Sequence, residues 1–233
     1  MIKFDKRYVP AFLQTVGFAV SVWAVASMAT IPLLLCSVVM FYLYTLIGVV
    51  ITYHRILAHR VGKMHPVVEF ICTGLGFFGT LVSPVLYVGA HINHHKFMDT
   101  ERDPHSPHHL GWKTLFAILW VEGGDMKSML RMRRNKISNF YDKYSYPLLF
   151  VPLILLIWPK VFFFFWLIPM VASLWSQHMT THGHDENGPK TMGLLYAIFS
   201  CGEHHHRWHH DHPNDTSGEG WIHYITKLLT VRN

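Results

Sequence analysis

Long apolar stretches alternate with polar segments along the chain. Two stretches near the start, Tyr8–Ala29 and Ile31–Tyr53, contain no Asp, Glu, Lys or Arg and are separated by Thr30. A membrane-spanning helix needs about 20 apolar residues. A proline disfavours the helical conformation of the residue before it, so a helix is expected to break between Thr30 and Pro32. The pattern therefore predicts a helical hairpin of two spans, 8–29 and 31–53.

Two further apolar stretches predict a second hairpin, with spans at 141–158 and 161–179 around Pro159 and Lys160. The segment Val67–Ala90 is also apolar, but Gly74, Gly76, Gly79 and Pro84 interrupt it. Periodicity alone does not decide whether this segment crosses a membrane.

Composition supports a membrane protein. Of the 233 residues, 51% are hydrophobic and 15% charged, whereas an average soluble domain is about 25% charged. The net charge is +6, but all Lys and Arg except Lys160 fall within Met1–Arg7, within Arg55–Lys143 or from Lys190 onward. By the positive-inside rule, both termini and the long middle segment lie in the cytoplasm. A disordered or nucleic-acid-binding chain does not fit this distribution.

Two other interpretations of these features are weaker. The basic Met1–Arg7 followed by an apolar run resembles a cleavable signal peptide, but the run exceeds the usual length and a second span follows at once. The three cysteines, Cys36, Cys72 and Cys201, form no CxxC pair. A disulfide scaffold or a cysteine-based zinc site is therefore not expected.

Histidine is the second outlier, with 19 residues against 14 acidic ones. Eight of them form motifs beside apolar segments: an HxxxxH at 54–59, an HxxHH at 91–95 and a second HxxHH at 206–210. On a helix of 3.6 residues per turn, the three histidines of an HxxHH lie within about a 100° arc. Residues five apart diverge by about 140°, so His54 and His59 either reach different metals or straddle a helix end.

About nine imidazoles are too many for one ion and suit two, and neutral imidazole binds Fe, Zn, Cu and Ni alike. The sequence predicts a dinuclear site near the cytoplasmic surface. If the histidines before and after Val67–Ala90 share this site, that segment re-enters the membrane, lies at the interface or packs inside.

Carboxylates beside the motifs are candidates to accept the remote ring N–H of the ligands. These are Asp99, Glu101, Asp103, Asp185, Glu203 and Asp211.

Single histidines outside the motifs are expected at the surface or as satisfied core residues: His65, His105, His108, His109 and His223. His204 and His205 fit a loose metal-buffering tract. A histidine-rich membrane transporter would carry ionisable residues within its spans, whereas here they lie at or beyond the span ends. A bis-histidine haem protein is a further possibility, which a strong Soret band would reveal.

The motifs resemble those of the membrane fatty acid desaturase family, nearest the acyl-CoA (stearoyl-CoA, delta-9) type. The resemblance rests on His54-Arg55…His59-Arg60, on His91-Ile-Asn-His94-His95 continuing to Asp103-Pro104-His105, and on Gly202-Glu203-His-His-His206-Arg-Trp-His209-His210 with Pro213 after it. Family-like motifs cover about Thr52–Trp112 and Gln177–Pro213, and the hairpins match in layout alone.

The resemblance implies an all-α integral membrane protein: four transmembrane helices in two hairpins, with a cytosolic helical cap carrying a histidine-ligated di-iron site, in one domain over residues 1–233. It implies nine iron ligands and no separate catalytic residue. Carried over by position, the ligands are His54, His59, His91, His94, His95, His182, His206, His209 and His210. His178 stands where the family has an Asn, so it is a candidate outer-shell residue or alternative ligand.

The implied reaction is O2-dependent desaturation of a long saturated acyl thioester or acyl lipid, delta-9-like, with electrons from a separate ferredoxin or b-type cytochrome and its reductase. The run Arg131–Lys136 is a candidate docking patch for that carrier, although a basic juxtamembrane run is common. The region Phe77–Gly79 is a candidate tunnel wall. The compact chain suggests a bacterial-type inner or thylakoid membrane rather than the ER.

The nearest alternative is an oxygenase on the same histidine boxes, such as a lipid or carotenoid hydroxylase, a ketolase or an alkane monooxygenase. The continuation Asp103-Pro104-His105 favours a desaturase. Regiospecificity, acyl carrier and electron donor are left open by the sequence.

Overall fold

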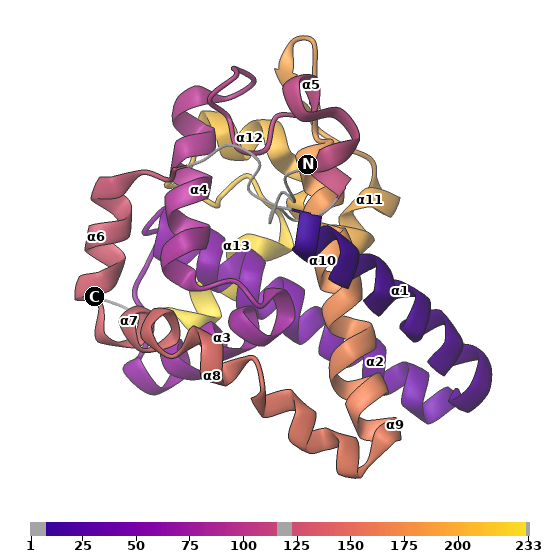
Figure 1. The fold of residues 1–233 in the computed structure, drawn as a ribbon. Coiled ribbons are helices and arrows are strands. Elements are labelled where there is room, and N and C mark those ends of the chain that lie inside the picture. The colour runs from indigo at the N-terminus through magenta and orange to yellow at the C-terminus, as the bar shows by residue number, and fades with distance from the viewer. Residues whose placement is uncertain (1–7, 116–122, 232–233) are drawn as a thin grey trace, which may run out of the picture.

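A computed structural model describes residues 8–115 and 123–231, and these are mostly helical (Figure 1). The basic segment 1–7, on which the predicted topology partly rests, lies outside the described residues. The helices of the first half are α1 (Tyr8–Met28), α2 (Ile31–Tyr42), η1 (Leu43–Ala58), α3 (Pro66–Thr80), α4 (Pro84–Phe97), α5 (Pro107–Leu110) and η2 (Gly111–Leu115).

The second half continues with shorter helices and one two-stranded sheet. Its elements are α6 (Met126–Arg134), α7 (Lys136–Lys143), α8 (Ser145–Leu148), η3 (Val151–Ile157), α9 (Pro159–Val161), η4 (Phe162–Leu167), α10 (Ile168–Thr181), β1 (His184–Asp185), β2 (Gly188–Pro189), α11 (Leu194–Phe199), η5 (Glu203–His205), α12 (His206–Asp211) and α13 (Trp221–Leu229). Strands β1 and β2 pair antiparallel.

The turn of the first predicted hairpin lies where the sequence places it, but the described apolar helix before it, Phe12–Met28, is shorter than a candidate span. Thr30 is extended (φ −132°, ψ 158°) between α1 and α2, and a proline occupies the first turn of α2, where its missing N–H costs no hydrogen bond. The second helix does not end at Tyr53 as predicted, because α2 runs directly into η1. The joint helix, Ile31–Ala58, has 28 residues and is long and apolar enough to cross a membrane.

The second predicted hairpin is only partly present. Pro159–Thr181 forms a 23-residue helix that is also long and apolar enough to cross a membrane. The predicted span 141–158 is not one straight helix, because Lys136–Lys143 and Ser145–Ile157 are bent by 72°. Pro147 and Pro152 lack the N–H that a continuous helix requires there. By length and composition the described residues contain two candidate spans, or up to four if each bent pair counts as one.

The other bent pair is α3 and α4, which cover the interrupted segment Val67–Ala90. Their axes differ by 77°, and the turn between them begins at Leu81 in the left-handed conformation (φ 58°). The hydroxyl of Ser83 accepts a hydrogen bond from the N–H of Leu86 and caps α4. The bend brings the histidines of α4 back beside those of η1, so the segment does not separate the two motifs.

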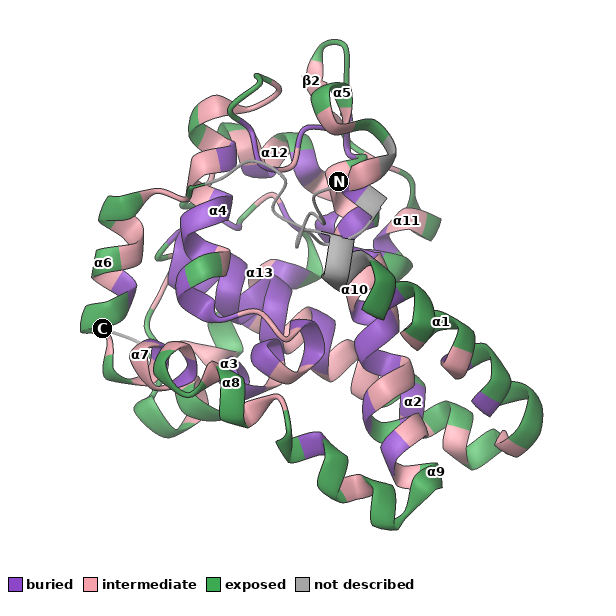
Figure 2. Cartoon of the chain, viewed as in Figure 1, coloured by how far each residue is buried: buried purple, intermediate pink, exposed green. Residues whose placement is uncertain are grey.

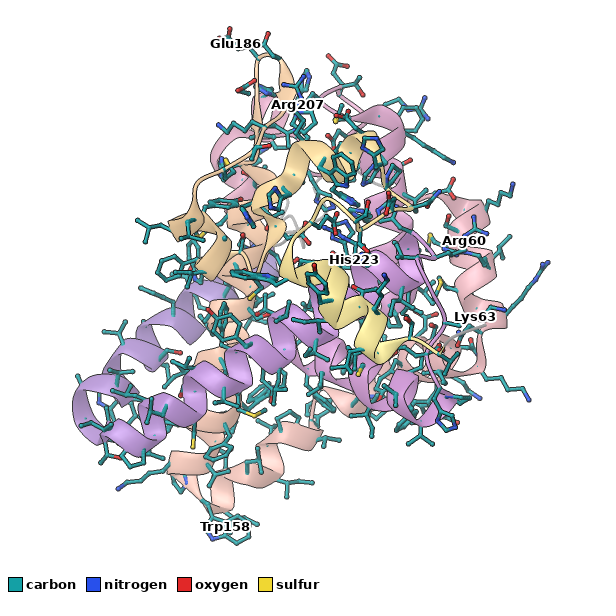
Figure 3. The ribbon with its side chains drawn as sticks, turned by 180° about the vertical axis from the view of Figure 1, so that it is seen from behind. Arg60, Lys63, Trp158, Glu186, Arg207 and His223 are labelled. Carbon is teal, nitrogen blue, oxygen red and sulfur yellow. The ribbon has the colours of Figure 1, made fainter. Side chains whose placement is uncertain are left out.

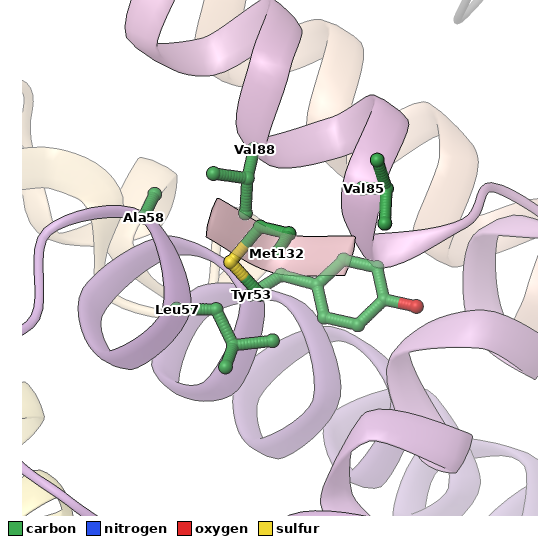
Figure 4. Close-up of a cluster of buried hydrophobic side chains, with 6 residues drawn as sticks. All are labelled: Tyr53, Leu57, Ala58, Val85, Val88 and Met132. Carbon is green, nitrogen blue, oxygen red and sulfur yellow. The ribbon is translucent and has the colours of Figure 1, made fainter. Parts of the chain in front are cut away.

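Close contact between η1 and α3 depends on glycine. A Cβ on Gly48 would lie 2.3 Å from the backbone nitrogen of Gly76, so the two backbones approach as closely as only glycine permits. The adjoining core cluster packs Tyr53, Leu57 and Ala58 against α4 and Met132 (Figure 4). Phe77 is completely buried in this region.

Exposure differs sharply between the two ends of the molecule. Side chains of α1, α2 and η3 are largely exposed although apolar, whereas η1, α3 and α4 are largely buried (Figure 2). Leu35, Val39 and Ile157 are each more than half exposed. Nitrogen and oxygen atoms gather at the end opposite Trp158 (Figure 3). Such a large exposed apolar surface is unusual for a protein in water and suits a lipid environment.

We expect Gly48→Ala to destabilise the fold by about 2–3 kcal/mol, because the new methyl group overlaps backbone that cannot move aside as a side chain would. Thermal unfolding of the purified chain in detergent measures the change. Gly193→Ala is the matched control, since a Cβ there meets nothing within 4 Å. Equal melting temperatures for the two variants would contradict the tight crossing.

Candidate metal centre

Nine histidines converge in two adjacent groups. The first cluster comprises His54, His59, His91, His95 and His209, and the second comprises His94, His184, His206 and His210. Within each cluster, one ring nitrogen from every histidine lies within 4.8 Å of all the others. Eight of these nine were predicted from the sequence. The rings of His95 and His210 stack with centroids 4.3 Å apart, so the two clusters touch.

Helix geometry divides each HxxHH motif between the clusters in the same way. On α4, His91 and His95 face the first cluster and His94 the second. On α12, His206 and His210 face the second cluster and His209 the first. In both motifs the pair four residues apart shares a cluster, as neighbours on one helical face do, and the remaining histidine serves the other cluster.

The HxxxxH motif lies at the end of η1, where the hydrogen-bond pattern is π-helical. The N–H of His59 donates to the carbonyl of His54 at 3.1 Å, an i→i+5 bond. This bond brings residues five apart to the same face, which an α-helix does not. His54 and His59 therefore straddle a helix end and belong to one cluster, which is the second of the two arrangements that their spacing allows.

One of the nine histidines predicted as ligands lies apart from the two groups. His182 is exposed and lies outside both clusters, with its Nε2 3.3 Å from the Thr114 hydroxyl. His184 takes its place, because α10 ends at Thr181 and the chain turns through Gly183 before β1. A Cβ on Gly183 would lie 3.0 Å from the His206 ring, so this turn passes directly beside the second cluster.

Carboxylates contact the outer nitrogen, Nδ1, of four clustered histidines. The pairs are His54–Glu203 at 3.2 Å, His94–Asp103 at 2.8 Å, His184–Asp99 at 2.9 Å and His209–Glu219 at 3.3 Å. Three of the six acidic residues predicted for this role therefore fill it. The other three, Glu101, Asp185 and Asp211, are exposed. Glu219 was not predicted, because it lies nine residues beyond the last histidine box. The two glycines beside it are the only local feature that could have drawn attention to this carboxylate.

These contacts determine which ring nitrogens face inward. A carboxylate at Nδ1 places the ring proton there and leaves Nε2 as a lone pair. The Nε2 atoms of His54 and His209 are 2.7 Å apart, as are those of His59 and His91, and those of His184 and His206 are 2.9 Å apart. In the His54–His209 pair, where both rings face a carboxylate at Nδ1, the two inward lone pairs repel one another, and a cation between them would satisfy both. The donor set thus fits one metal ion in each cluster.

Burial keeps the clustered rings neutral. Burial and the Arg55 guanidinium lower the pKa of His59 to about 3, and the same two causes hold the pKa of His209 well below its usual value. Burial and the neighbouring His184 do the same to the pKa of His206. Neutral imidazole is the form that binds metal, so the site does not need to release protons first.

The other histidines lie outside both clusters. His178 is 3% exposed and lines a cavity together with His105; burial lowers the pKa of His105 to about 4. The rings of His204 and His205 lie 3.9 Å apart and are partly exposed. The remaining single histidines contact loop or helix-end groups, as expected of structural residues: His65, His108, His109 and His223.

A cavity of about 320 Å³ adjoins both clusters. His54 and His91 of the first cluster line it, as do His94 and His206 of the second. Its other walls are mainly apolar and come largely from α4, α10 and the end of α3 with the turn after it, with contributions from η2, η5 and the loop before α5. They are lined by Thr80, Val82, Leu86, Tyr87, Ala90, Pro104, Thr114, Leu174, Gln177, Thr180, Thr181 and Glu203. Phe77–Gly79, predicted as a tunnel wall, does not line this cavity because α3 turns these residues into the helix packing.

No family model matches the chain, but several curated proteins are similar to it. It is 28% identical over 195 residues to delta-9 acyl-lipid desaturase 2 of Arabidopsis thaliana, covering 75% of this chain and 62% of that protein. It is 27% identical over 223 residues to acyl-CoA C20 delta5-desaturase of Anemone leveillei, covering 82% and 70%.

A shorter match of 105 residues, 32% identical, links it to icosanoyl-CoA 5-desaturase of Limnanthes douglasii, covering 42% of this chain and 29% of that protein. The chain thus spans less than two thirds of the length of several of these relatives. All three proteins are named as fatty acid desaturases, and this confirms the resemblance predicted from the histidine motifs. The chain is therefore similar to proteins named as fatty acid desaturases.

Proposed function

We propose that this chain is an O2-dependent fatty acyl desaturase with two iron ions. The observation that carries the proposal is the cavity, whose walls are mainly apolar and which meets both histidine clusters at once. In the overall reaction, two adjacent methylenes each lose one hydrogen and O2 is reduced to two waters with two electrons and two protons from outside. The bound ions would supply the redox chemistry that no side chain provides.

The chain's own contribution is binding, orientation and exclusion of water. Five histidines would hold one ion and four the other, and the carboxylates at Nδ1 fix the orientation of the rings. The apolar walls accept an acyl chain and exclude water from it. Because Ala90 and Leu86 lie on the same helix as His91 and His94, the wall that holds the acyl chain and the ligands move as one rigid element.

In this proposal the candidate spans form four transmembrane helices in two hairpins, with the histidine clusters in a cytosolic cap. The single domain extends over residues 1–233, and both termini lie in the cytoplasm. A bacterial-type inner or thylakoid membrane is the proposed location. The supporting observations are the apolar helix Phe12–Met28, the candidate spans Ile31–Ala58 and Pro159–Thr181, the bent pair Lys136–Lys143 and Ser145–Ile157, and the exposed apolar side chains of α1, α2 and η3.

The substrate is a long saturated acyl thioester or acyl lipid, with a delta-9-like position of the new double bond. The relatives are named for acyl-lipid and acyl-CoA substrates and for positions 9 and 5. A ferredoxin or b-type cytochrome would supply the electrons. Of the predicted docking patch, Arg131 is engaged within the chain through the Leu57 carbonyl. Arg133, which also contacts Asp142, is exposed together with Arg134 and Lys136.

Expression in a desaturase-deficient host tests the reaction. We expect cellular fatty acids to gain a cis double bond, and His54→Ala to abolish the product because the first cluster loses a ligand. A hydroxylated product without a double bond would instead support the alternative, an oxygenase on the same histidine scaffold. Gas chromatography with mass spectrometry distinguishes the two products.

The ligand assignment is tested by comparing His184→Ala with His182→Ala. We expect purified His184→Ala to lose at least one of the two irons, because its ring lies in the second cluster, whereas His182→Ala keeps both. Iron per chain is measured by elemental analysis. Loss of iron in His182→Ala but not in His184→Ala would show that the family-based position is the true ligand.

The cavity is tested by Leu174→Trp, which fills space between α10 and the clusters. Product formation should fall by more than about tenfold while iron content stays that of the unsubstituted chain, because Leu174 lines the cavity without contacting a ligand set. Leu195→Trp is the matched control, since Leu195 is 76% exposed. Unchanged product in Leu174→Trp would place the acyl chain elsewhere.

A further inference from the structure

A buried arginine joins two histidines of the first cluster through their carboxylates. Arg55 is 1% exposed, and Glu203 and Glu219 are 2% and 1% exposed. Its Nε donates to Glu219 at 2.7 Å, and its Nη2 lies 3.0 Å from Glu203. A buried arginine with two carboxylates requires good geometry to offset the loss of hydration, and here two separate edges of the guanidinium each engage one carboxylate.

Each of these carboxylates also faces one ligand. Glu203 contacts Nδ1 of His54, and Glu219 contacts Nδ1 of His209. The Nε2 atoms of the same two rings meet at 2.7 Å inside the first cluster. One guanidinium is thus connected to two imidazoles from helices far apart in sequence, η1 and α12. Its Nη1 also lies within hydrogen-bond distance of both ring nitrogens of His54, 2.5 Å from Nδ1 and 2.8 Å from Nε2.

The second cluster is held differently. Asp103, which contacts His94, accepts hydrogen bonds from the backbone N–H groups of Asp99 and His105 at 2.9 and 2.8 Å. Its orientation is therefore set by a tight turn of the backbone rather than by an arginine. A change at Arg55 should affect one cluster and leave the other intact.

We propose that Arg55 is a positioning residue of the first cluster, which fixes His54 and His209 through Glu203 and Glu219; this rests on the proposed function insofar as the clusters hold metal. A planar fork of donors is required, because two carboxylates on different sides must be engaged at once. Lysine offers a single point charge and cannot replace it.

The experiment titrates metal-stripped, purified full-length chain with Fe(II) under argon and follows both equivalents by Mössbauer spectroscopy. We expect Arg55→Lys to lower the affinity for one Fe(II) equivalent by about 10–100-fold, the usual effect of losing an outer partner of a ligand. The affinity for the other equivalent should change by less than about threefold, and Asp103→Asn should lower that second affinity instead. Arg60→Gln is the matched control, because Arg60 is exposed just after the same helix and should change neither.

If Arg55→Lys lowers the Fe(II) affinity of both equivalents equally, or of neither, the assignment of Arg55 to the first cluster is wrong. If that variant does not fold, as judged by the melting temperature of the metal-free chain, Glu219→Gln replaces it and is expected to weaken the equivalent that Asp103→Asn spares. An unsubstituted chain that binds no iron would refute the proposed function and this inference with it. Two bound irons with no selective effect would refute this inference alone.

Discussion

Nine imidazoles that point into two small volumes cannot all satisfy one another. Carboxylates face Nδ1 in four of the nine rings, which leaves their Nε2 atoms as acceptors, and two of these acceptors, on His54 and His209, lie 2.7 Å apart. Buried polar groups left in this state are costly, and protonation is opposed because burial lowers the pKa of His59 and His206. Cations in the clusters resolve the conflict, so the fold around them is best understood as a scaffold for bringing these rings together.

Three departures from regular helix geometry serve that purpose. The π-helical end of η1 aligns His54 with His59, the 77° bend between α3 and α4 returns the second motif to the first, and the turn at Gly183 delivers His184. Each departure costs regular hydrogen bonding or conformational freedom. They are tolerated because close packing of η1 against α3, through Gly48 and Gly76, holds the helices that carry the ligands.

The sequence was sufficient to predict the helical class, the turn of the first hairpin and eight of the nine clustered histidines, because their spacing on helices is a local property. His184 was missed since it lies beyond a helix end, where a turn rather than a periodicity decides which of two nearby histidines points inward. Glu219 was missed because it approaches His209 only through tertiary folding. The bend that interrupts the predicted span 141–158 follows from prolines within an otherwise apolar run. Hydropathy does not show how these prolines change the direction of the helix.

The cavity approaches both clusters from α4 and α10 with mainly apolar walls, and most of the groups that orient the ligands lie away from it. Among the described residues, Glu203 lines the cavity, whereas Asp99, Asp103, Glu219 and Arg55 do not. A substrate without charge along its chain can therefore approach both clusters while meeting a single ligand-orienting carboxylate. In the proposed desaturase, the scarcity of charged residues and the abundance of histidine have one origin: neutral ligands would surround metal at the place where an apolar chain enters.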